Sequence, residues 1–393
     1  MNRLRQYVVE YRPIGLCAGG LMWLIWIVSS ALGTGNLDRN GQVIGTDHTA
    51  FHTAALLLLE GRGDALFDYP HLQAFRAEQE RITGSPGFSD PYRNPPFYAL
   101  PYESTARLPY LLSFALWAGI GLLALVAGLY LIRGRKIFWP LLWSLSFYPV
   151  FAVVSFGQNT LLSVGIFGLV YRCLVSERRF FAGLAAGFLL FKPQLLMGLG
   201  VWWLLSWRKY WPSLLGICVT AGFFAGLSLW LLPDESRTWV QRLPDIARYD
   251  AFEFFNLHNS RGFGDLLTGN REIGIYVGLA GLMLSLVWFT GFWARHRQDA
   301  TLMFAAALLT TLWGSPHTMT YEWALAILPA ILLWDHRPLR RGTWLLIFAI
   351  CWAALFLSTP LAKAQLTLMG VAIQLSVPCL ALAIWRIGRE LRQ

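Results

Sequence analysis

Charged residues are scarce in this 393-residue chain. Asp, Glu, Lys and Arg make up 14% of the sequence, whereas soluble domains contain roughly 25%. Hydrophobic residues make up 56%, and the 19 tryptophans and 26 phenylalanines are typical of large lipid-facing and interfacial areas. These values exclude an ordinary soluble protein. Apolar runs recur from end to end, and they predict an all-α polytopic membrane protein.

Several motifs of nucleotide-binding and metal-binding proteins are also absent. There is no P-loop and no GxGxxG in a βαβ context, so no nucleotide cofactor is expected. The five cysteines show no CxxC spacing and indicate neither a disulfide framework nor a zinc site. The net charge of +10 comes from basic residues scattered in short turns, which is a poor pattern for nucleic-acid binding.

Twelve apolar segments are candidate membrane spans. They lie at 14–33, 108–132, 138–155, 160–175, 180–191, 194–206, 212–232, 273–294, 300–313, 321–334, 343–359 and 365–387. Several are shorter than the roughly 20 residues that a full crossing needs. We expect these short spans to tilt strongly or to lie among other helices.

The basic residues sort to one set of connections. They cluster at 3–12, 133–136, 172–179, 208–209, 295–297, 337–341 and 386–392. In the short connections at 156–159, 192–193, 314–320 and 360–364, the only Lys or Arg residues are Lys192 and Lys363. This positive-inside pattern predicts a multi-pass inner (plasma) membrane protein with both termini in the cytoplasm. It requires the segment 180–206 to cross twice, with a bend at "FKPQ" (191–194).

We expect residues 1–393 to form a single integral membrane domain with two long outside loops. They cover 34–107 and 233–272, and the first contains helical patterns near 48–60 and 70–82. Structured long loops are commonly functional. The other polar segments marked by Gly or Pro fall on the same side of the membrane, so we expect the functional site on the extracytoplasmic face.

Asp47 stands at the head of the first of these predicted helices, and two roles suit it. Asp is a preferred N-cap, whose carboxylate accepts hydrogen bonds from the helix backbone. A carboxylate at a membrane-facing cleft is also a natural general base for a hydroxyl group. His48 and His52 are four residues apart and raise the alternative of a metal site, but no third ligand is evident, and we expect no metal.

Four basic side chains on the outer face are candidate phosphate partners: Arg93, Lys192, Arg261 and His317. Each also has a purely structural reading. Arg93 lies in a Pro-rich turn near an aromatic belt, and Lys192 can snorkel from between two short spans. A helix beginning near Ser315 would present its N-terminus to an anion beside His317.

Two further outer turns contribute polar candidates for substrate binding. "GQNT" contains Gln158 and Asn159 and can equally be a tight polar turn, whereas "SPHTMTYE" adds Tyr321 and Glu322. Together with His48 these side chains surround a site reached from both water and lipid. Such a site suits transfer of a group from a lipid-linked phosphate to a polar acceptor.

The order of these elements resembles glycosyltransferase family 87, the membrane mannosyltransferase-type enzymes that use polyprenyl-phosphate sugars. The matching pieces are "GTDHTAFHTAALLLLEGRGDALFDYP", "YRNPPFYALPY", "SFGQNTLLSVGIFGL", "AGLAAGFLLFKPQLLMGLGVWWLLSWRKYW" and "GSPHTMTYEWALAILPA". The resemblance implies a C-type glycosyltransferase fold with amphipathic helices in the first outer loop. It implies membrane lipids, a lipid-linked donor and a glycolipid or glycan acceptor as partners, and no cofactor.

The resemblance also assigns roles to residues. Asp47 matches the position of the family's catalytic aspartate, which implies a general base and transfer with inversion. Lys192 matches the family's Lys-Pro element, and His317 and Tyr321 lie in its Ser-Pro turn. Glu322 follows where many relatives carry an acidic residue. The sugar is expected to be mannose or a related pentose or hexose.

Two other functions are compatible with the sequence. Twelve spans with both termini inside are common in transporters and lipid flippases. Those proteins usually place polar breaks at the bilayer midplane, whereas the polar elements here gather at one face. A polymer ligase or acyltransferase that uses a lipid-linked donor is a third alternative.

Overall fold

All the regular secondary structure is helical over the residues that the computed structural model describes, which are 12–69, 71–248, 254–337 and 340–391. Within them the only β-type pairings are isolated bridges such as that between Leu257 and Met319. The α-helices are α2 (Arg12–Ala31), α3 (His48–Leu59), α4 (Gln73–Thr83), α5 (Leu100–Ala106), α6 (Tyr110–Arg133), α7 (Phe138–Leu145), α8 (Tyr148–Phe156), α9 (Thr160–Val175), α10 (Arg179–Gly187), α11 (Met197–Leu205), α12 (Trp207–Leu231), α13 (Pro233–Arg248), α14 (Ser260–Thr268), α15 (Arg271–His296), α16 (Ala300–Gly314), α17 (Ile327–His336), α18 (Arg341–Met369) and α19 (Ser376–Glu390). Short 3₁₀ helices are η1 (Gly63–Phe67), η2 (Pro96–Tyr98), η3 (Phe188–Phe191), η4 (Pro193–Leu196), η5 (Phe254–Asn256) and η6 (Thr320–Ala326).

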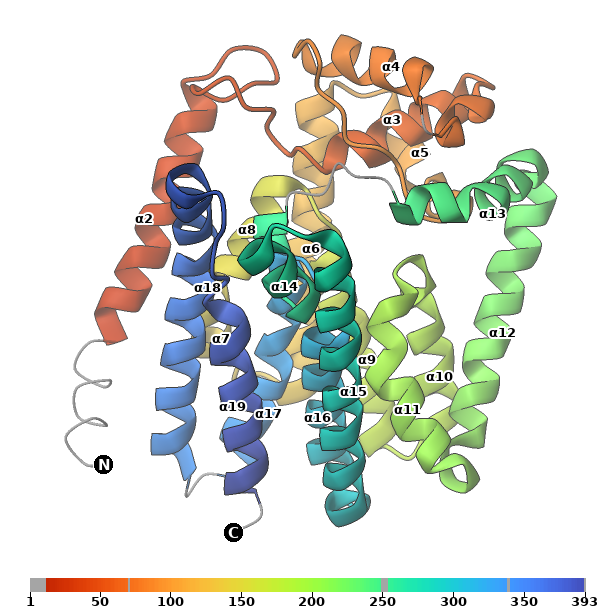
Figure 1. Cartoon of the computed structure of the whole chain (residues 1–393). Coiled ribbons are helices and arrows are strands. Elements are labelled where there is room, and N and C mark those ends of the chain that lie inside the picture. The colour runs from red at the N-terminus through yellow and green to blue at the C-terminus, as the bar shows by residue number, and fades with distance from the viewer. Residues whose placement is uncertain (1–11, 70, 249–253, 338–339, 392–393) are drawn as a thin grey trace.

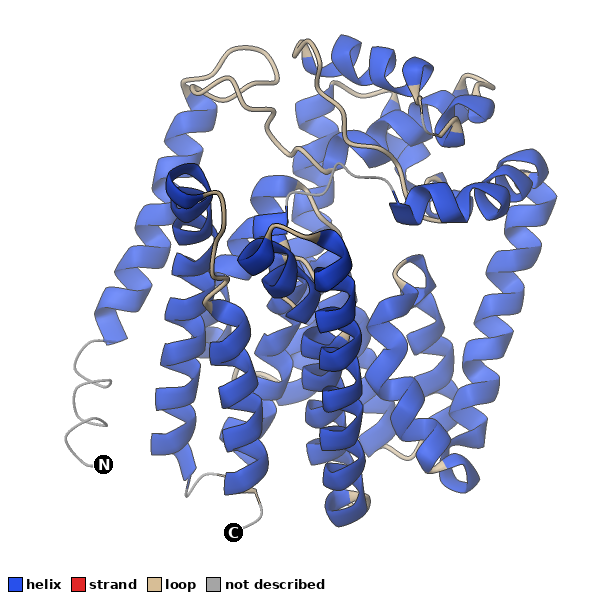
Figure 2. Cartoon of the chain, viewed as in Figure 1, coloured by secondary structure: helices blue, strands red, loops and turns tan. Residues whose placement is uncertain are grey.

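The helices form an upright bundle covered at one end by a cap. Figure 1 shows α3, α4, α5 and α13 lying across the upper end of the bundle, and Figure 2 shows that loops are concentrated there. The cap has its own core of buried side chains, including Phe51, Phe75 and Tyr92. A run of stacked rings joins it to the bundle, because Tyr102 stacks on Phe51 at 5.0 Å and on Trp117 of α6 at 4.0 Å.

Within the described residues, five helices are long and apolar enough to cross a membrane: α2, α6, α12, α15 and α18. The pair α7 and α8 makes a sixth span if its 67° bend is counted as one crossing. Much of this apolar surface faces outward, since Leu123 is 70% exposed and Trp230 is 79% exposed. Exposed apolar side chains along such helices fit contact with lipid, so the chain is a multi-pass membrane protein.

Most predicted helices of the bundle are present near their expected bounds. α9 spans the predicted 160–175, and α16 ends one residue beyond the predicted 300–313. The segment 180–206 does turn back at Lys192, between η3 and η4, so α10 and α11 form a hairpin whose tip is "FKPQ". The full count of twelve crossings stays a prediction, because several of these helices are shorter than a membrane span.

One predicted turn is wrong. The expected connection at 360–364 lies inside α18, which continues through Pro360 to Met369 and ends at Gly370 with a φ of +73°. Proline removes one backbone hydrogen bond but does not end a helix whose flanking residues are held elsewhere. Here Ser358 donates to Gln374, and Thr359 pairs with the buried ring of His258.

The described basic connections lie together at the end of the bundle opposite the cap, whereas all but the last residue of the predicted cluster at 3–12 lies outside the described residues. Figure 1 shows α12 and α18 beginning there, and α15 and α19 ending there. These helix ends carry Arg208, Arg295, Arg341 and Arg389 among others. The basic short connections of the sequence pattern therefore share one end of the bundle.

Candidate active site

Asp47 is held in a tight turn between the cap and the bundle. Gly45 precedes it with a φ of +71°, and a Cβ at Gly45 would lie 2.5 Å from the Phe114 ring. The Tyr110 hydroxyl donates to the carbonyl of Gly45 at 2.6 Å, and the Asp47 amide donates to Phe156 O of α8 at 2.8 Å. The turn therefore has little freedom to move relative to α6 and α8.

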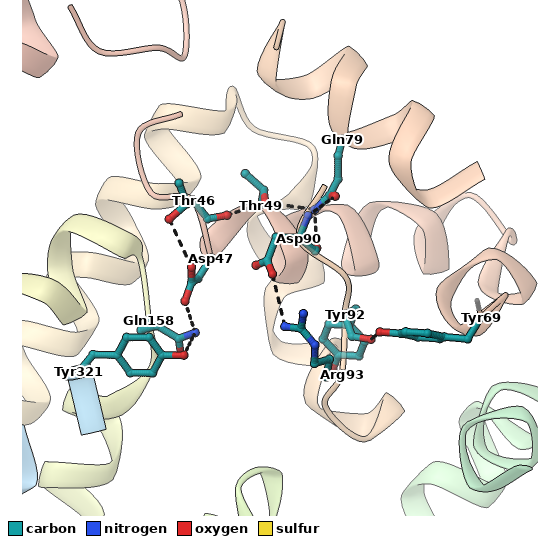
Figure 3. A network of polar contacts seen from close by, with 10 residues as sticks. All are labelled: Thr46, Asp47, Thr49, Tyr69, Gln79, Asp90, Tyr92, Arg93, Gln158 and Tyr321. Atoms are coloured by element: carbon teal, nitrogen blue, oxygen red, sulfur yellow. Dashed lines mark hydrogen bonds and ion pairs between the residues drawn. The ribbon is translucent and has the colours of Figure 1, made fainter. Parts of the chain in front are cut away.

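The carboxylate of Asp47 does not cap α3. The residue occupies the N-cap position, but no side-chain cap hydrogen bond forms. Instead Oδ2 accepts from Gln158 Nε2 at 2.5 Å, and Oδ1 accepts from Thr46 Oγ1 at 3.3 Å. The capping role that the sequence allowed is therefore wrong, and the carboxylate points toward Gln158 and Tyr321 (Figure 3).

Gln158 joins Asp47 to a buried ion pair. It lies in the turn between α8 and α9, and its Oε1 accepts from Lys192 Nζ at 3.0 Å. Lys192 Nζ also donates to Glu322 Oε1 at 2.9 Å and lies 5.0 Å from the centre of the Tyr321 ring. The Tyr321 hydroxyl in turn accepts from Gln158 Nε2 at 3.2 Å. The structure thus brings five of the predicted site residues into one cluster.

A second carboxylate, Asp90, lies beside the first. Its Oδ1 is 3.4 Å from Arg93 Nη1, and Gln79 clamps its backbone from both sides. The same Gln79 donates to Thr49 of α3, the helix that begins just after Asp47 (Figure 3). The clamp therefore ties the segment carrying Asp90 and Arg93 to the helix behind Asp47.

Burial raises the pKa of Asp47, whereas the Gln158 hydrogen bond and the charges of Lys192 and Arg93 act in the opposite direction. Burial, and then the negative charge of Asp47, raise the pKa of Asp90 to about 7, against the opposing effect of Arg93. Two carboxylates that interact in this way do not ionise independently. The pair therefore holds a proton at a higher pH than free aspartates would.

His317 lies in an extended loop between α16 and η6. Burial, and then the charges of Arg93, Lys192 and Arg261, lower the pKa of His317 to about 3. The ring is therefore neutral at pH 7 and can donate one hydrogen bond. The predicted helix beginning near Ser315 is wrong, because Ser315 instead follows the end of α16 and the next helical turn starts at Thr320. The loop stays extended because Thr318 O accepts from His258 N at 3.0 Å.

Three predicted residues lie at the margins of the cluster. Arg261 on α14 is partly buried and lies 3.9 Å from Asp265, although its charge reaches His317. Asn159 is buried at the start of α9, and only its backbone amide reaches Gln158 Oε1, at 3.3 Å. His48 points away toward α6, where its Nε2 lies 3.1 Å from Ser113 Oγ.

The histidines of α3 share this one hydroxyl, since His52 Nδ1 lies 3.2 Å from Ser113 Oγ. Over the described part of the chain, no group of three His, Cys, Asp or Glu side chains is arranged to hold a metal ion. Burial lowers the pKa of His48 to about 3, so its ring is neutral. Both rings serve the packing of the cap against α6.

Sequence reasoning missed Asp90 and Gln79. A signal for Asp90 was present, because "SDPYRNPP" places it three residues before Arg93, next to the Pro-rich turn that was singled out. Gln79 gave no such signal, since it lies in the middle of an ordinary polar helix. Its role depends on contacts with residues 11 and 30 positions away.

Comparison with known proteins identifies the family. No curated protein and no solved structure matches the chain. The profile of glycosyltransferase family 87 matches residues 92–316, which is more than half of the sequence. The matched region contains Arg93, Gln158, Lys192 and Arg261, whereas Asp47, His317, Tyr321 and Glu322 lie outside it. This helical membrane protein, with its carboxylates and cations gathered beneath the cap, belongs to glycosyltransferase family 87.

Proposed function

We propose that this glycosyltransferase moves a sugar from a polyprenyl-phosphate donor to a hydroxyl group of a glycolipid or glycan acceptor. The acceptor oxygen attacks the anomeric carbon and loses its proton to Asp47. The bond between the anomeric carbon and the phosphate oxygen breaks, and polyprenyl phosphate leaves with the electron pair. Attack opposite the leaving group inverts the anomeric configuration. The sugar is mannose or a related hexose or pentose.

The observation that carries the proposal is the state of Asp47. Its carboxylate makes no capping hydrogen bond to the helix backbone, its turn is anchored to α6 and α8, and the residue is partly buried. A base needs a fixed position and a pKa near the working pH. Burial moves the pKa of Asp47 in that direction.

The leaving phosphate needs positive charge, and Arg93 and Arg261 are the proposed sources. Both charges act on His317, so they converge on the loop that carries it. A neutral His317 would add a hydrogen-bond donor. Fixed charges in a site of low dielectric stabilise the charge that develops on a leaving group.

The site would face the extracytoplasmic side of the plasma membrane, with both termini in the cytoplasm. The cap and the site share one end of the bundle, and the basic connections share the other end. Positive charge marks the cytoplasmic side of membrane proteins. Because the donor is held in the lipid, neither a nucleotide nor a metal has a part in the proposed step.

The test is an assay of the purified protein with a panel of polyprenyl-phosphate sugars and glycolipid acceptors. The expected result is release of free polyprenyl phosphate in step with a glycosylated product, unaffected by chelators. A transporter or flippase would move a labelled lipid across vesicles without releasing the lipid phosphate. Translocation of that kind, with no product from any donor, would overturn the proposal.

A further inference from the structure

The ammonium group of Lys192 is fully engaged in the structure. The side chain is buried at 8% exposure, and Nζ donates to Gln158 Oε1 and to Glu322 Oε1. The Tyr321 ring lies on a further side of it, at 5.0 Å. A cation with this set of neighbours already has its counter-charge within the protein, and a phosphate would have to displace Glu322 to take it.

Glu322 is also buried and hydrogen-bonded within the protein. It is 1% exposed, and its second oxygen, Oε2, accepts from the Met319 backbone amide at 2.7 Å. Removing one partner of a buried pair leaves an uncompensated charge, which strongly destabilises a protein. The pair is therefore a built part of the site and not a loose surface contact.

These neighbours determine which way the side-chain amide of Gln158 is oriented. A lysine ammonium only donates hydrogen bonds, so the Gln158 atom facing it must be the oxygen. The Asn159 backbone amide, a second donor, faces the same oxygen at 3.3 Å. The NH₂ group must then face Asp47, to which it donates at 2.5 Å. An amide turned the other way would place its oxygen against the carboxylate.

We propose that Lys192, with Glu322 as its buried counter-charge, is a positioning residue for Asp47, acting through Gln158. The ammonium group holds the Gln158 amide in the one orientation that donates a hydrogen bond to the Asp47 carboxylate. That bond favours the ionised form of Asp47, the form that accepts the acceptor's proton. The inference deepens the proposed function and rests on it wherever turnover is the readout.

The variant that tests this relay is Lys192→Met combined with Glu322→Gln. The double change removes the ammonium donor but leaves no unpaired charge in the protein. Gln158 loses its strongest constraint, and its hydrogen bond to Asp47 weakens. The acid limb of the pH profile of kcat/KM should then move to higher pH, with a loss of about tenfold at neutral pH, since positioned bases contribute at least that much.

Glu322→Gln alone is the matched control. It keeps the Lys192 ammonium, so Gln158 stays oriented, and it removes a negative charge that acts on Asp47. Its acid limb should therefore stay in place or move to lower pH. Gln158→Met should reproduce the shift of the double variant, and combining all three changes should add little more. A donor KM that rises in the double variant, with an unmoved acid limb, would overturn the relay and assign Lys192 to the phosphate.

A second readout needs no turnover. Infrared spectra recorded across a pH series follow the carbonyl band of protonated Asp47, which is assigned by its loss in Asp47→Asn. In the double variant this band should persist to higher pH than in the unmodified protein, and an identical titration in both would contradict the relay. If no donor is turned over, the proposed function fails, while the infrared comparison still decides the relay.

Discussion

At the scale of single residues, the site is organised around two carboxylates with different surroundings. Asp47 receives a hydrogen bond from Gln158, whereas Asp90 faces Arg93 at 3.4 Å. Burial raises the pKa of both groups, and the charge of Asp47 contributes to the rise at Asp90. Environments that give two neighbouring carboxylates different pKa values are a common way for proteins to assign one the role of acid and the other the role of base.

Asp90→Asn should stabilise the protein at alkaline pH. The folded-state pKa of about 7 exceeds the value of about 3.9 expected in an unfolded chain. The stabilisation from protonated Asp90 is therefore complete below about pH 4 and is lost as the pH rises through 7. An asparagine does not ionise. The variant should therefore unfold at a temperature a few degrees higher than the unmodified protein at pH 8, and at nearly the same temperature as the unmodified protein at pH 4. Thermal unfolding in detergent measures this, with the exposed Asp68→Asn as control. A variant no more stable than the unmodified protein at pH 8 would contradict the assignment.

Arg93→Gln should weaken use of the donor more than use of the acceptor. The change removes a positive charge that acts on both Asp47 and His317. Loss of a charge-assisted contact to a phosphate typically amounts to about 1.5–3 kcal/mol, which is roughly a 10- to 100-fold effect. Steady-state kinetics with each substrate varied separately would show it as a raised KM for the lipid-linked donor. An effect confined to the acceptor would assign Arg93 to that substrate instead.

At the scale of elements, close contacts between helix backbones keep the bundle in register beneath the site. A Cβ at Gly216 of α12 would lie 2.4 Å from Phe180 O of α10. Farther along, α12 carries Phe224, which stacks on Phe97 of the cap at 4.5 Å. Small residues at helix crossings allow this approach in membrane proteins.

Gly216→Val should therefore destabilise the protein, because the added side chain forces α12 away from α10. Overpacking of this kind typically costs about 1–3 kcal/mol. Gly222→Val is a matched control in the same helix, since no atom lies within 4 Å of a Cβ placed there. Thermal unfolding of the two variants side by side makes the measurement. Equal loss of stability would show that helix propensity, and not the α10 contact, is responsible.

Elements were predictable from the sequence where local patterns decide them. Apolar runs and helix-ending glycines gave α9 and the two helices of the first loop to within a few residues. The sequence could not show that α18 continues past Pro360, because bonds from Ser358 and Thr359 to distant residues permit it. Nor could it reveal that Glu322 pairs with Lys192, a contact between residues 130 positions apart. Asp47 was identified from the sequence, but its position at the head of a helix suggested an N-cap. In the structure its carboxylate instead accepts a hydrogen bond from the distant Gln158.

At the scale of the whole molecule, the chain is polarised along the axis of the bundle. The cap and the candidate site lie at one end, and the connections rich in arginine lie at the other. A sugar donor held in the outer leaflet would meet a water-borne or lipid-borne acceptor beneath the cap. This arrangement depends on the orientation of the protein in the membrane.

Reporter cysteines test that orientation. The five natural cysteines are first replaced by alanine, and Ala77→Cys or Ser176→Cys is then introduced. Both positions are exposed, the first on α4 of the cap and the second at the end of α9. In intact spheroplasts a membrane-impermeant maleimide should label position 77 but label position 176 only after permeabilisation. The reverse pattern would place the site in the cytoplasm.

The central claim is that Asp47 accepts the proton during transfer from a lipid phosphate. Its most direct test is the rate at which purified Asp47→Asn releases polyprenyl phosphate, compared with the unmodified protein and with Asp68→Asn. Asparagine keeps the shape of the side chain but cannot accept the proton. We predict a loss of at least about a hundredfold for Asp47→Asn and none for the control. Release at an undiminished rate from Asp47→Asn would contradict the account.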